Sequence, residues 1–260
     1  MKMTGSTLLI TGGGSGIGRG LAEAFHALGN QVIIAGRSRK KLDETTAANP
    51  GMKSFTADMA DAASIQSFAA QVTESYPELN VLINMAGIMS AENLQSQKDT
   101  LVNAEAMVAT NLLGPIRLTA ALLPLLQKQP AATIMNVTSG LAFVPLAMTP
   151  TYCATKAALH SYTQSLRYQL KGTAIAVLEL APPYVATELM GPAPTSDPNA
   201  MPLAEYITEV MDILTTQPEA TEILVKRVYP LRFAADQGQD KYQEMFQGFN
   251  DAMTAAFAHH

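Results

Sequence analysis

Short apolar runs alternate with longer segments in which apolar residues recur at helical spacing, from the N-terminus to about residue 180. The runs are short and often β-branched, which is typical of strands buried on both faces of a parallel sheet. Ser38 and Asp61 are suited to cap the helices that they precede. We therefore expect an α/β fold, a Rossmann-like doubly wound parallel sheet of six or seven strands with helices on both faces. The expected strands are 7–11, 31–35, 53–57, 81–84, 132–138 and 174–180, and the expected helices are 16–29, 38–48, 61–75, 98–127 and 151–171.

The pattern changes after Leu180, where six of the 15 prolines fall between residues 182 and 202. Such a segment cannot form a regular helix or a central strand. Beyond it, residues 203–216, 218–228 and 239–257 have helical patterns, and no seventh strand is evident. We expect a single domain over residues 1–258, with a proline-rich substrate loop and a helical C-terminal part at about 182–257.

Composition narrows the possible partners. The chain has 260 residues, and its 17 basic and 22 acidic side chains give a net charge of −5, so nucleic acid is not an expected partner. One cysteine, Cys153, cannot form an internal disulfide, and together with so few histidines it provides too few ligands for a zinc site, so we expect no metal. No signal-peptide pattern opens the chain, and we expect a cytoplasmic protein without a membrane partner.

A glycine cluster directly follows the first expected strand and opens the first helix, in the segment Thr11-Gly12-Gly13-Gly14-Ser15-Gly16-Ile17-Gly18. Glycines allow a close backbone approach, and free amides at a helix start attract negative charge. The cluster predicts a site for a dinucleotide pyrophosphate, formed by Gly12, Ser15, Gly16, Ile17 and Gly18. The alternative is a strand-to-helix turn that uses glycine only for its dihedral angles.

The spacing Thr-Gly-x-x-x-Gly-x-Gly resembles that of the classical short-chain dehydrogenase/reductase family. The resemblance implies further cofactor contacts, with Asp58 and Met59 at the adenine. It also matches Asn84-Met85-Ala86-Gly87 to the family's Asn-Asn-Ala-Gly segment, with methionine for the second asparagine, and so implies Asn84, Ala86 and Gly87. Pro182, Val185 and Thr187 match the nicotinamide segment, although Pro183 replaces a glycine there. Pro183 and the tail segment 224–233 resemble the bacterial branch named for D-alanine esterification of teichoic acids.

The end of the second strand indicates which dinucleotide binds. An acid there would hold the ribose diol of NAD, but the sequence has Arg37 followed by Ser38, Arg39, Lys40 and Lys41. The planar fork of a guanidinium suits a ribose phosphate. NADP(H) is therefore favoured over NAD(H), and a solvated basic helix start is the alternative.

Tyr152 and Lys156 lie four residues apart on one expected helix, and so on one face. A phenol with a pKa of about 10 needs a nearby cation to donate its proton efficiently near neutral pH, and we expect Lys156 to lower the pKa of Tyr152. Ser139 ends a buried strand, where sites of open sheets form. The resemblance implies that Ser139 bonds a substrate carbonyl and that Asn111 supports a proton relay. Without it, Ser139 is a turn residue and Asn111 a helix residue with a polar contact.

These residues predict an NADP-dependent oxidoreductase that transfers a hydride between the cofactor and a carbonyl or secondary alcohol, with Tyr152 as general acid and base. The alternative is a catalytically silent dinucleotide-binding sensor or scaffold. We expect a homodimer or homotetramer and a small, apolar, uncharged substrate. The expected lining of its site is Leu141, Phe143, Val144, Leu146, Met148, Tyr184, Leu189 and Met190.

Overall fold

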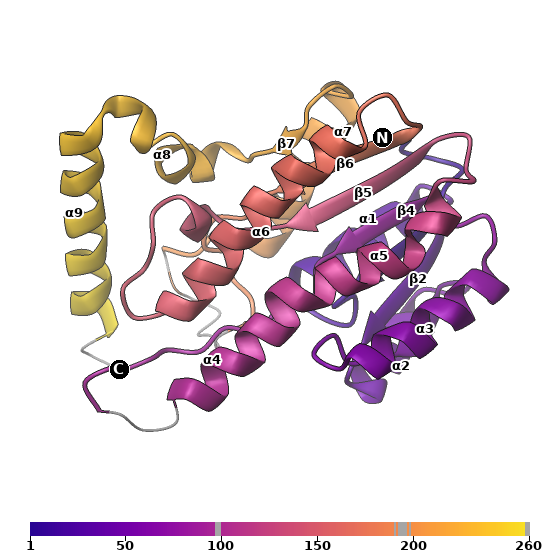
Figure 1. Cartoon of the computed structure of the whole chain (residues 1–260), viewed down its shortest axis with the longest axis horizontal. Helices are drawn as coiled ribbons and strands as arrows, with labels where there is room; N and C mark the ends of the chain where they lie inside the picture. Colours follow the sequence, from indigo (N-terminus) through magenta and orange to yellow (C-terminus); the bar gives the residue numbers. More distant parts are fainter. Residues whose placement is uncertain (97–99, 190, 192–196, 198, 258–260) are drawn as a thin grey trace.

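In the computed structural model, which describes residues 1–96, 100–189, 191, 197 and 199–257, seven strands form one parallel sheet (Figure 1). The order across the sheet is β3-β2-β1-β4-β5-β6-β7. The chain reverses direction across the sheet between β1 and β4, as in a doubly wound fold, and the fold prediction is confirmed. The strands are β1 (Thr7–Thr11), β2 (Gln31–Gly36), β3 (Lys53–Thr56), β4 (Val81–Asn84), β5 (Ala132–Val137), β6 (Ile175–Leu180) and β7 (Glu222–Ile223).

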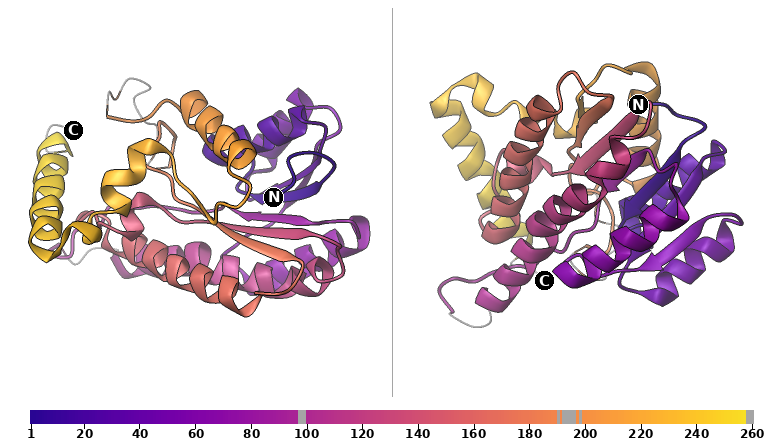
Figure 2. Two further views of the ribbon diagram at one scale, coloured as in Figure 1. Left: turned by 90° about the horizontal axis from the view of Figure 1, so that it is seen from above. Right: turned by 45° about the vertical axis from the view of Figure 1, so that its right-hand side comes forward.

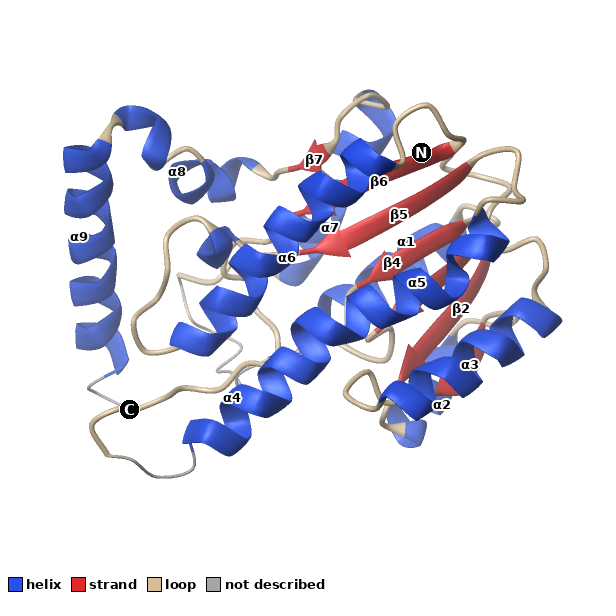
Figure 3. Ribbon diagram, in the orientation of Figure 1, coloured by secondary structure: helices blue, strands red, loops and turns tan. Residues whose placement is uncertain are grey.

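Helices cover both faces of the sheet (Figures 2 and 3). One face packs against α1 (Gly16–Ala27), α2 (Arg39–Ala48) and α7 (Leu203–Thr216). The other packs against α3 (Ala62–Ser75), α5 (Gly114–Leu126) and α6 (Pro150–Gln169). The remaining helices are α4 (Thr100–Val108), α8 (Tyr229–Arg232) and α9 (Gln239–Phe257).

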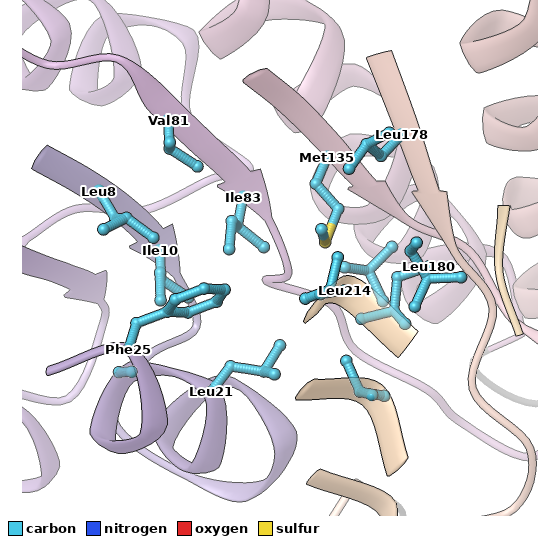
Figure 4. Close-up of a cluster of buried hydrophobic side chains, with 14 of the residues drawn as sticks. Leu8, Ile10, Leu21, Phe25, Val81, Ile83, Met135, Leu178, Leu180 and Leu214 are labelled. Atoms are coloured by element: carbon cyan, nitrogen blue, oxygen red, sulfur yellow. The ribbon is translucent and has the colours of Figure 1, made fainter. Parts of the chain in front are cut away.

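The core follows from the alternation of side chains along the central strands. Leu8 and Ile10 of β1 point into the cluster beneath α1 and α7, whereas Leu9 points into the cluster on the opposite face. Figure 4 shows the first cluster, with Leu21 and Phe25 of α1 packed on the strands. Because both faces are covered, the central strands are apolar at successive positions, and this explains the continuous apolar runs in the sequence.

The structure corrects the prediction for residues 218–228, which do not form a helix. Glu222 and Ile223 add the seventh strand, in register with Glu179 and Leu180 of β6, and Lys226–Val228 form a 3-10 turn. Apolar positions in so short a segment fit either a strand or a helix, and pairing with β6 decides between them.

The expected helix 98–127 is continuous from Thr100 but contains a π-helical turn at Ala109–Leu113, between α4 and α5. Among the described residues, Leu101–Leu126 is the one helical stretch whose length and composition would allow it to cross a membrane. Leu118, Leu122 and Leu126 are fully buried against the sheet and α3, as in the core helix of a globular domain. The helix therefore has a place in this fold without a bilayer.

Candidate active site

The glycine loop turns the chain from β1 into α1 with its backbone close to the next strand. Gly12 has φ of 70°, and a Cβ on it would lie 3.0 Å from the Cα of Ala86. A Cβ on Gly18 would collide with the carbonyl oxygen of Gly12. Ser15 precedes α1 in an extended conformation without a side-chain cap, and the first turn of α1 contains no acid. This helix start therefore leaves its amides available to an anion.

A cleft of about 570 Å³ opens beside this loop, at the carboxyl ends of β1 to β4. Seven of the predicted cofactor residues line it, and the absence of side chains on its glycines leaves room for a ligand against the backbone. The predicted residues on its wall are Gly12, Ser15, Arg37, Asp58, Met59, Ala86 and Gly87. In its lining and its place at the carboxyl ends of the strands, the cleft fits a dinucleotide.

Asn84 differs from the other predicted cofactor residues because its side chain is buried inside the sheet. It donates hydrogen bonds to Oδ1 of Asn136, at 2.8 Å, and to Oγ1 of Thr119, at 3.1 Å. The structure thus gives the side chain of Asn84 a supporting place behind the cleft. Thr11, which the sequence analysis missed, accepts hydrogen bonds from the amides of Met85 and Ala86, each at 3.0 Å, and fixes the segment that lines the cleft.

The cations after β2 are not equivalent. Arg37 and Lys41 line the cleft, and within the described part of the chain Arg37 forms no ion pair. Arg37 is exposed at the mouth of the cleft and is therefore the cation most available to an anionic ligand. The other three pair with acids, in Arg39–Asp43 at 3.5 Å, Lys40–Glu44 at 3.9 Å and Lys41–Glu188 at 2.9 Å.

Tyr152 and Lys156 lie side by side on α6, both almost fully buried. The Nζ atom of Lys156 is 5.6 Å from the centre of the Tyr152 ring and donates a hydrogen bond of 2.8 Å to the carbonyl of Val137. Burial lowers the pKa of Lys156 to about 8, because the charged ammonium loses solvation. Lys156 is therefore poised to exchange a proton at mildly alkaline pH.

The pKa of Tyr152 contradicts one expectation from the sequence. Burial raises the pKa well above the ordinary value of a phenol, and the hydrogen bond with Ser139 lowers it by a smaller amount. The expected lowering by Lys156 is wrong for this arrangement, because loss of solvation dominates and the ammonium is bonded to Val137. The same hydrogen bond places Ser139 beside the phenol.

Asn111 lies in the π-helical turn and is fully buried. Its Oδ1 accepts a hydrogen bond of 2.9 Å from the amide of Ile88, and its Nδ2 donates to the carbonyl of Ile88 at 2.8 Å and to Thr155 Oγ1 at 3.3 Å. A Cβ built on Gly87 would be 3.4 Å from Asn111 Oδ1 and 3.8 Å from Lys156 Nζ. The structure therefore brings Asn111, Gly87 and Lys156 together, and the polar contacts compensate for an asparagine inside a helix.

Glu92, which follows β4, holds the start of α6 and was not predicted. Its carboxylate accepts hydrogen bonds from the amide of Thr151, at 2.9 Å, and from the hydroxyl of Thr151, at 2.8 Å. The residue before the helix, Thr149, provides no side-chain cap. Glu92 thus replaces a local cap one residue before Tyr152, and no sequence signal indicates a partner so distant in the chain.

Pro182, Val185 and Thr187 follow β6 at the same edge of the sheet. The carbonyl of Pro182 accepts a hydrogen bond of 2.8 Å from the amide of Gly140, and Val185 pairs with Met201 as an isolated bridge. The methyl group of Thr187 lies 3.4 Å from a Cβ built on Gly16, so this segment reaches the glycine loop.

The predicted substrate lining is only partly brought together. Leu141, Leu146 and Met148 belong to one cluster with Tyr152, whereas the Phe143 ring packs against His160 with ring centres 4.9 Å apart. Val144 is fully buried outside that cluster, the hydroxyl of Tyr184 bonds to Asp197, and Leu189 is exposed. Met190 and, within the expected substrate loop, residues 192–196 and 198 lie outside the described residues.

A parallel sheet with a glycine loop at its first crossover and a buried Ser, Tyr, Lys and Asn at its carboxyl edge defines a class of dinucleotide-linked oxidoreductases. The family model described as short chain dehydrogenase matches residues 6–197. The chain belongs to this oxidoreductase family.

One curated relative agrees with this assignment, and two solved structures share the fold. The chain is 40% identical to the uncharacterized oxidoreductase DltE of Bacillus subtilis (strain 168), over 96% of this chain and 98% of that protein, and the predicted similarity to that branch is confirmed. A short chain dehydrogenase from Burkholderia cenocepacia, solved in complex with NADP, has a TM-score of 0.81 at 22% identity and covers 95% of this chain and 99% of its own. A relative from Burkholderia phymatum, in complex with NAD, has a TM-score of 0.77 at 20% identity, with 91% and 95% covered.

Proposed function

We propose that the protein is an NADP-dependent oxidoreductase that interconverts an uncharged carbonyl compound and its secondary alcohol. One observation carries this proposal. At the carboxyl edge of the sheet, Ser139 bonds to Tyr152 beside Lys156, and Asn111 holds Ile88 in the segment 86–88, which also lines the cleft of about 570 Å³. A reacting carbon held beside Tyr152 would thus be close to the end of a ligand in the cleft.

Tyr152 is the proposed proton donor in reduction. At neutral pH the phenol carries its proton, and it would give this proton to the alkoxide that forms on hydride transfer, which is a stronger base than a phenolate. The Ser139 hydroxyl would bond the same substrate oxygen and fix its position. In oxidation the phenol would first pass its own proton to Lys156 in its neutral form, and the resulting phenolate would take the proton of the alcohol; a rise in pH favours the neutral lysine.

Lys156 would return a proton to the Tyr152 phenolate, and Asn111 would support this transfer by holding the neighbouring backbone. The pKa of Lys156, lowered by burial to about 8, allows proton exchange near the pH of the cytoplasm. Asn111 holds the backbone of Ile88 through two hydrogen bonds and keeps the adjacent Gly87 near Lys156. We propose that Lys156 and Asn111 complete a proton path between the Tyr152 hydroxyl and solvent.

The cleft residues would hold the nicotinamide dinucleotide, which when bound supplies or accepts the hydride. The loop from Gly12 to Gly18 and the start of α1 would meet the pyrophosphate. Arg37, assisted by Lys41, would bind the ribose phosphate of NADP. The adenine half would lie on Asp58 and Met59, and the nicotinamide half near Ala86, Gly87, Pro182, Val185 and Thr187. Fold neighbours were solved with NADP and with NAD, so both support a nicotinamide cofactor, and the preference rests on Arg37.

The test is consumption of NADPH and of NADH against a panel of aldehydes, ketones and diketones. We expect faster turnover with NADPH and at least a hundredfold loss of kcat in Tyr152→Phe, since proton transfer contributes roughly 10²- to 10⁴-fold. Arg37→Ala is expected to raise KM for NADPH by about tenfold or more, because hydrogen bonds to charged groups contribute about 1.5–3 kcal/mol. Lys40→Ala is the matched control, because Lys40 is exposed, pairs with Glu44 and lies off the cleft wall.

Two outcomes would change the proposal. Cofactor binding without turnover of any substrate would favour the sensor or scaffold, and faster use of NADH would refute the role of Arg37. A cytoplasmic setting and self-association also remain predictions, and light scattering tests the second.

A further inference from the structure

Helix α9 lies beyond the carboxyl ends of the strands, at the end of the molecule where α6 begins (Figures 1 and 2). One side of α9 carries large apolar residues at helical spacing, all partly buried, whereas the opposite side is exposed. The apolar stripe consists of Tyr242, Met245, Phe246, Phe249 and Met253. The exposed side includes Gln243, Glu244, Gln247 and Asp251.

Asn250 fastens this helix to the segment that leads into α6. Its Oδ1 accepts a hydrogen bond of 2.6 Å from the amide of Ala147, and its Nδ2 donates one of 3.1 Å to the carbonyl of Pro145. Both bonds join α9 to the backbone five to seven residues before Tyr152. The helix is thus fixed relative to the proposed reacting group.

Phe249 and Met253 pack against the cluster that contains Tyr152. The buried members of this cluster are Met107, Leu146, Tyr152 and Cys153. Other partly buried apolar residues, Ile88, Met89, Leu141 and Met148, surround it from the segments after β4 and β5. Within this cluster Tyr152 therefore has apolar neighbours both from α9 and from the segments after β4 and β5.

The charges near this cluster are already bonded. Both carboxylate oxygens of Glu92 accept hydrogen bonds from Thr151, and the ammonium of Lys156 is buried and bonded to Val137. A substrate that carried its own charge into the cluster would lose solvation without gaining a partner. An apolar group gains there by leaving water.

We propose that α9 is the outer wall of the substrate site, and that Phe249 and Met253 bind an extended apolar arm of the substrate. The substrate class is then an uncharged ketone or secondary alcohol with a straight alkyl or aryl arm beside the reacting carbon. This inference rests on the proposed function in taking Tyr152 as the group that meets the carbonyl. It makes Phe249 a residue that determines specificity for chain length.

The experiment is calorimetric titration of short and long straight-chain methyl ketones into the full chain saturated with NADP⁺, which cannot reduce them. In the unaltered protein we expect affinity to rise about fourfold for each methylene that reaches the wall. Phe249→Ala is expected to lower the ratio of long-chain to short-chain affinity by about tenfold. Gln247→Ala, on the exposed side of the same helix, should keep that ratio and controls for changes in α9 itself.

Phe249→Trp separates a binding wall from a structural anchor. A larger ring should shorten the longest ketone that binds, whereas a residue that only anchors α9 would not shift this limit in that direction. Equal long-to-short ratios in the unaltered protein and in Phe249→Ala, or no gain with chain length in the unaltered protein, would overturn the inference.

Failure of the inference can be told apart from failure of the proposed function. Chain-length-dependent binding that is sensitive to Phe249, without any turnover of NADPH, would retain the wall and remove the catalytic assignment. Turnover that requires Tyr152, with no effect of Phe249 on the ratio, would do the reverse.

Discussion

Replacing Glu92 by alanine removes both hydrogen bonds that fix the first turn of α6, at 2.9 Å to the amide of Thr151 and 2.8 Å to its hydroxyl. No local group replaces them, because the side chain of Thr149 makes no cap bond to the helix amides and its hydroxyl instead meets the carbonyl of Leu146 at 3.4 Å. The next residue along the helix is Tyr152. The change therefore affects both the stability of the helix start and the position of the phenol.

The expected loss follows from the three contributions that Glu92 makes. A lost cap costs about 1 kcal/mol, and a carboxylate at a helix start contributes about 0.3–1 kcal/mol more. The second bond, from the hydroxyl to a charged acceptor in a half-buried place, adds about 1 kcal/mol. We expect Glu92→Ala to lower the free energy of unfolding by about 2.5 kcal/mol, and Glu92→Gln, which keeps one acceptor, by about half of that.

Urea unfolding measures this loss, and a double-mutant cycle with Thr151→Val isolates the hydroxyl bond, with an expected coupling of about 1 kcal/mol. A fall in kcat of about tenfold should accompany it, because small displacements of a reacting group are costly. Glu219→Ala is the control, since Glu219 is exposed and forms no ion pair within the described part of the chain. Unchanged unfolding and kcat in Glu92→Ala would refute the role of Glu92.

Three further perturbations test other parts of the structure. Burial lowers the pKa of Lys156 to about 8, so between pH 8 and 10 the unfolded chain binds more protons than the folded one and the free energy of unfolding rises with pH. Unfolding measured across this pH range should show that Lys156→Met removes up to about 3 kcal/mol of the rise. Glu179 is fully buried and hydrogen-bonded to His160 at 2.8 Å and to Thr138 at 2.6 Å. Glu179→Ala should therefore lower the free energy of unfolding in urea by about 3 kcal/mol. A smaller loss of stability in Glu179→Ala than in Glu179→Gln would contradict this prediction. Gly12→Ala forces an alanine into a left-handed backbone conformation, so we expect a loss of stability of about 1–2 kcal/mol and weaker dinucleotide binding. An unaltered dinucleotide affinity, measured by calorimetry, would count against the glycine loop as the phosphate site.

Local features that recur in one short stretch of chain could be predicted from the sequence. Apolar runs identified six strands, and Ser38 and Asp61 do cap α2 and α3 through their side chains. The positions of Ser139, Tyr152 and Lys156 followed from strand ends and helical spacing, because parallel strands end at one edge. The seventh strand could not be predicted from the sequence, because two residues show too little of a pattern and form a strand only when paired with β6.

The direction of the pKa of Tyr152 was mispredicted for a related reason. The spacing of four residues predicts Lys156 as a neighbouring cation of Tyr152. The burial of both side chains, which cannot be seen in the sequence, has the larger effect on their pKa values. The placement of Asn84 inside the sheet, bonded to Asn136 and Thr119, likewise depends on strands that lie far apart in the chain.

By itself, the sequence determined the class of fold, the glycine loop after β1 and the cations after β2, and it proposed the candidate site residues, because each depends on the order and spacing of nearby side chains. Only the tertiary structure decided that Glu92 caps α6, that Asn111 holds Ile88, and that α9 closes the apolar cluster around Tyr152. These contacts join segments separated by 23 to more than 90 residues, and their formation depends on how whole layers pack.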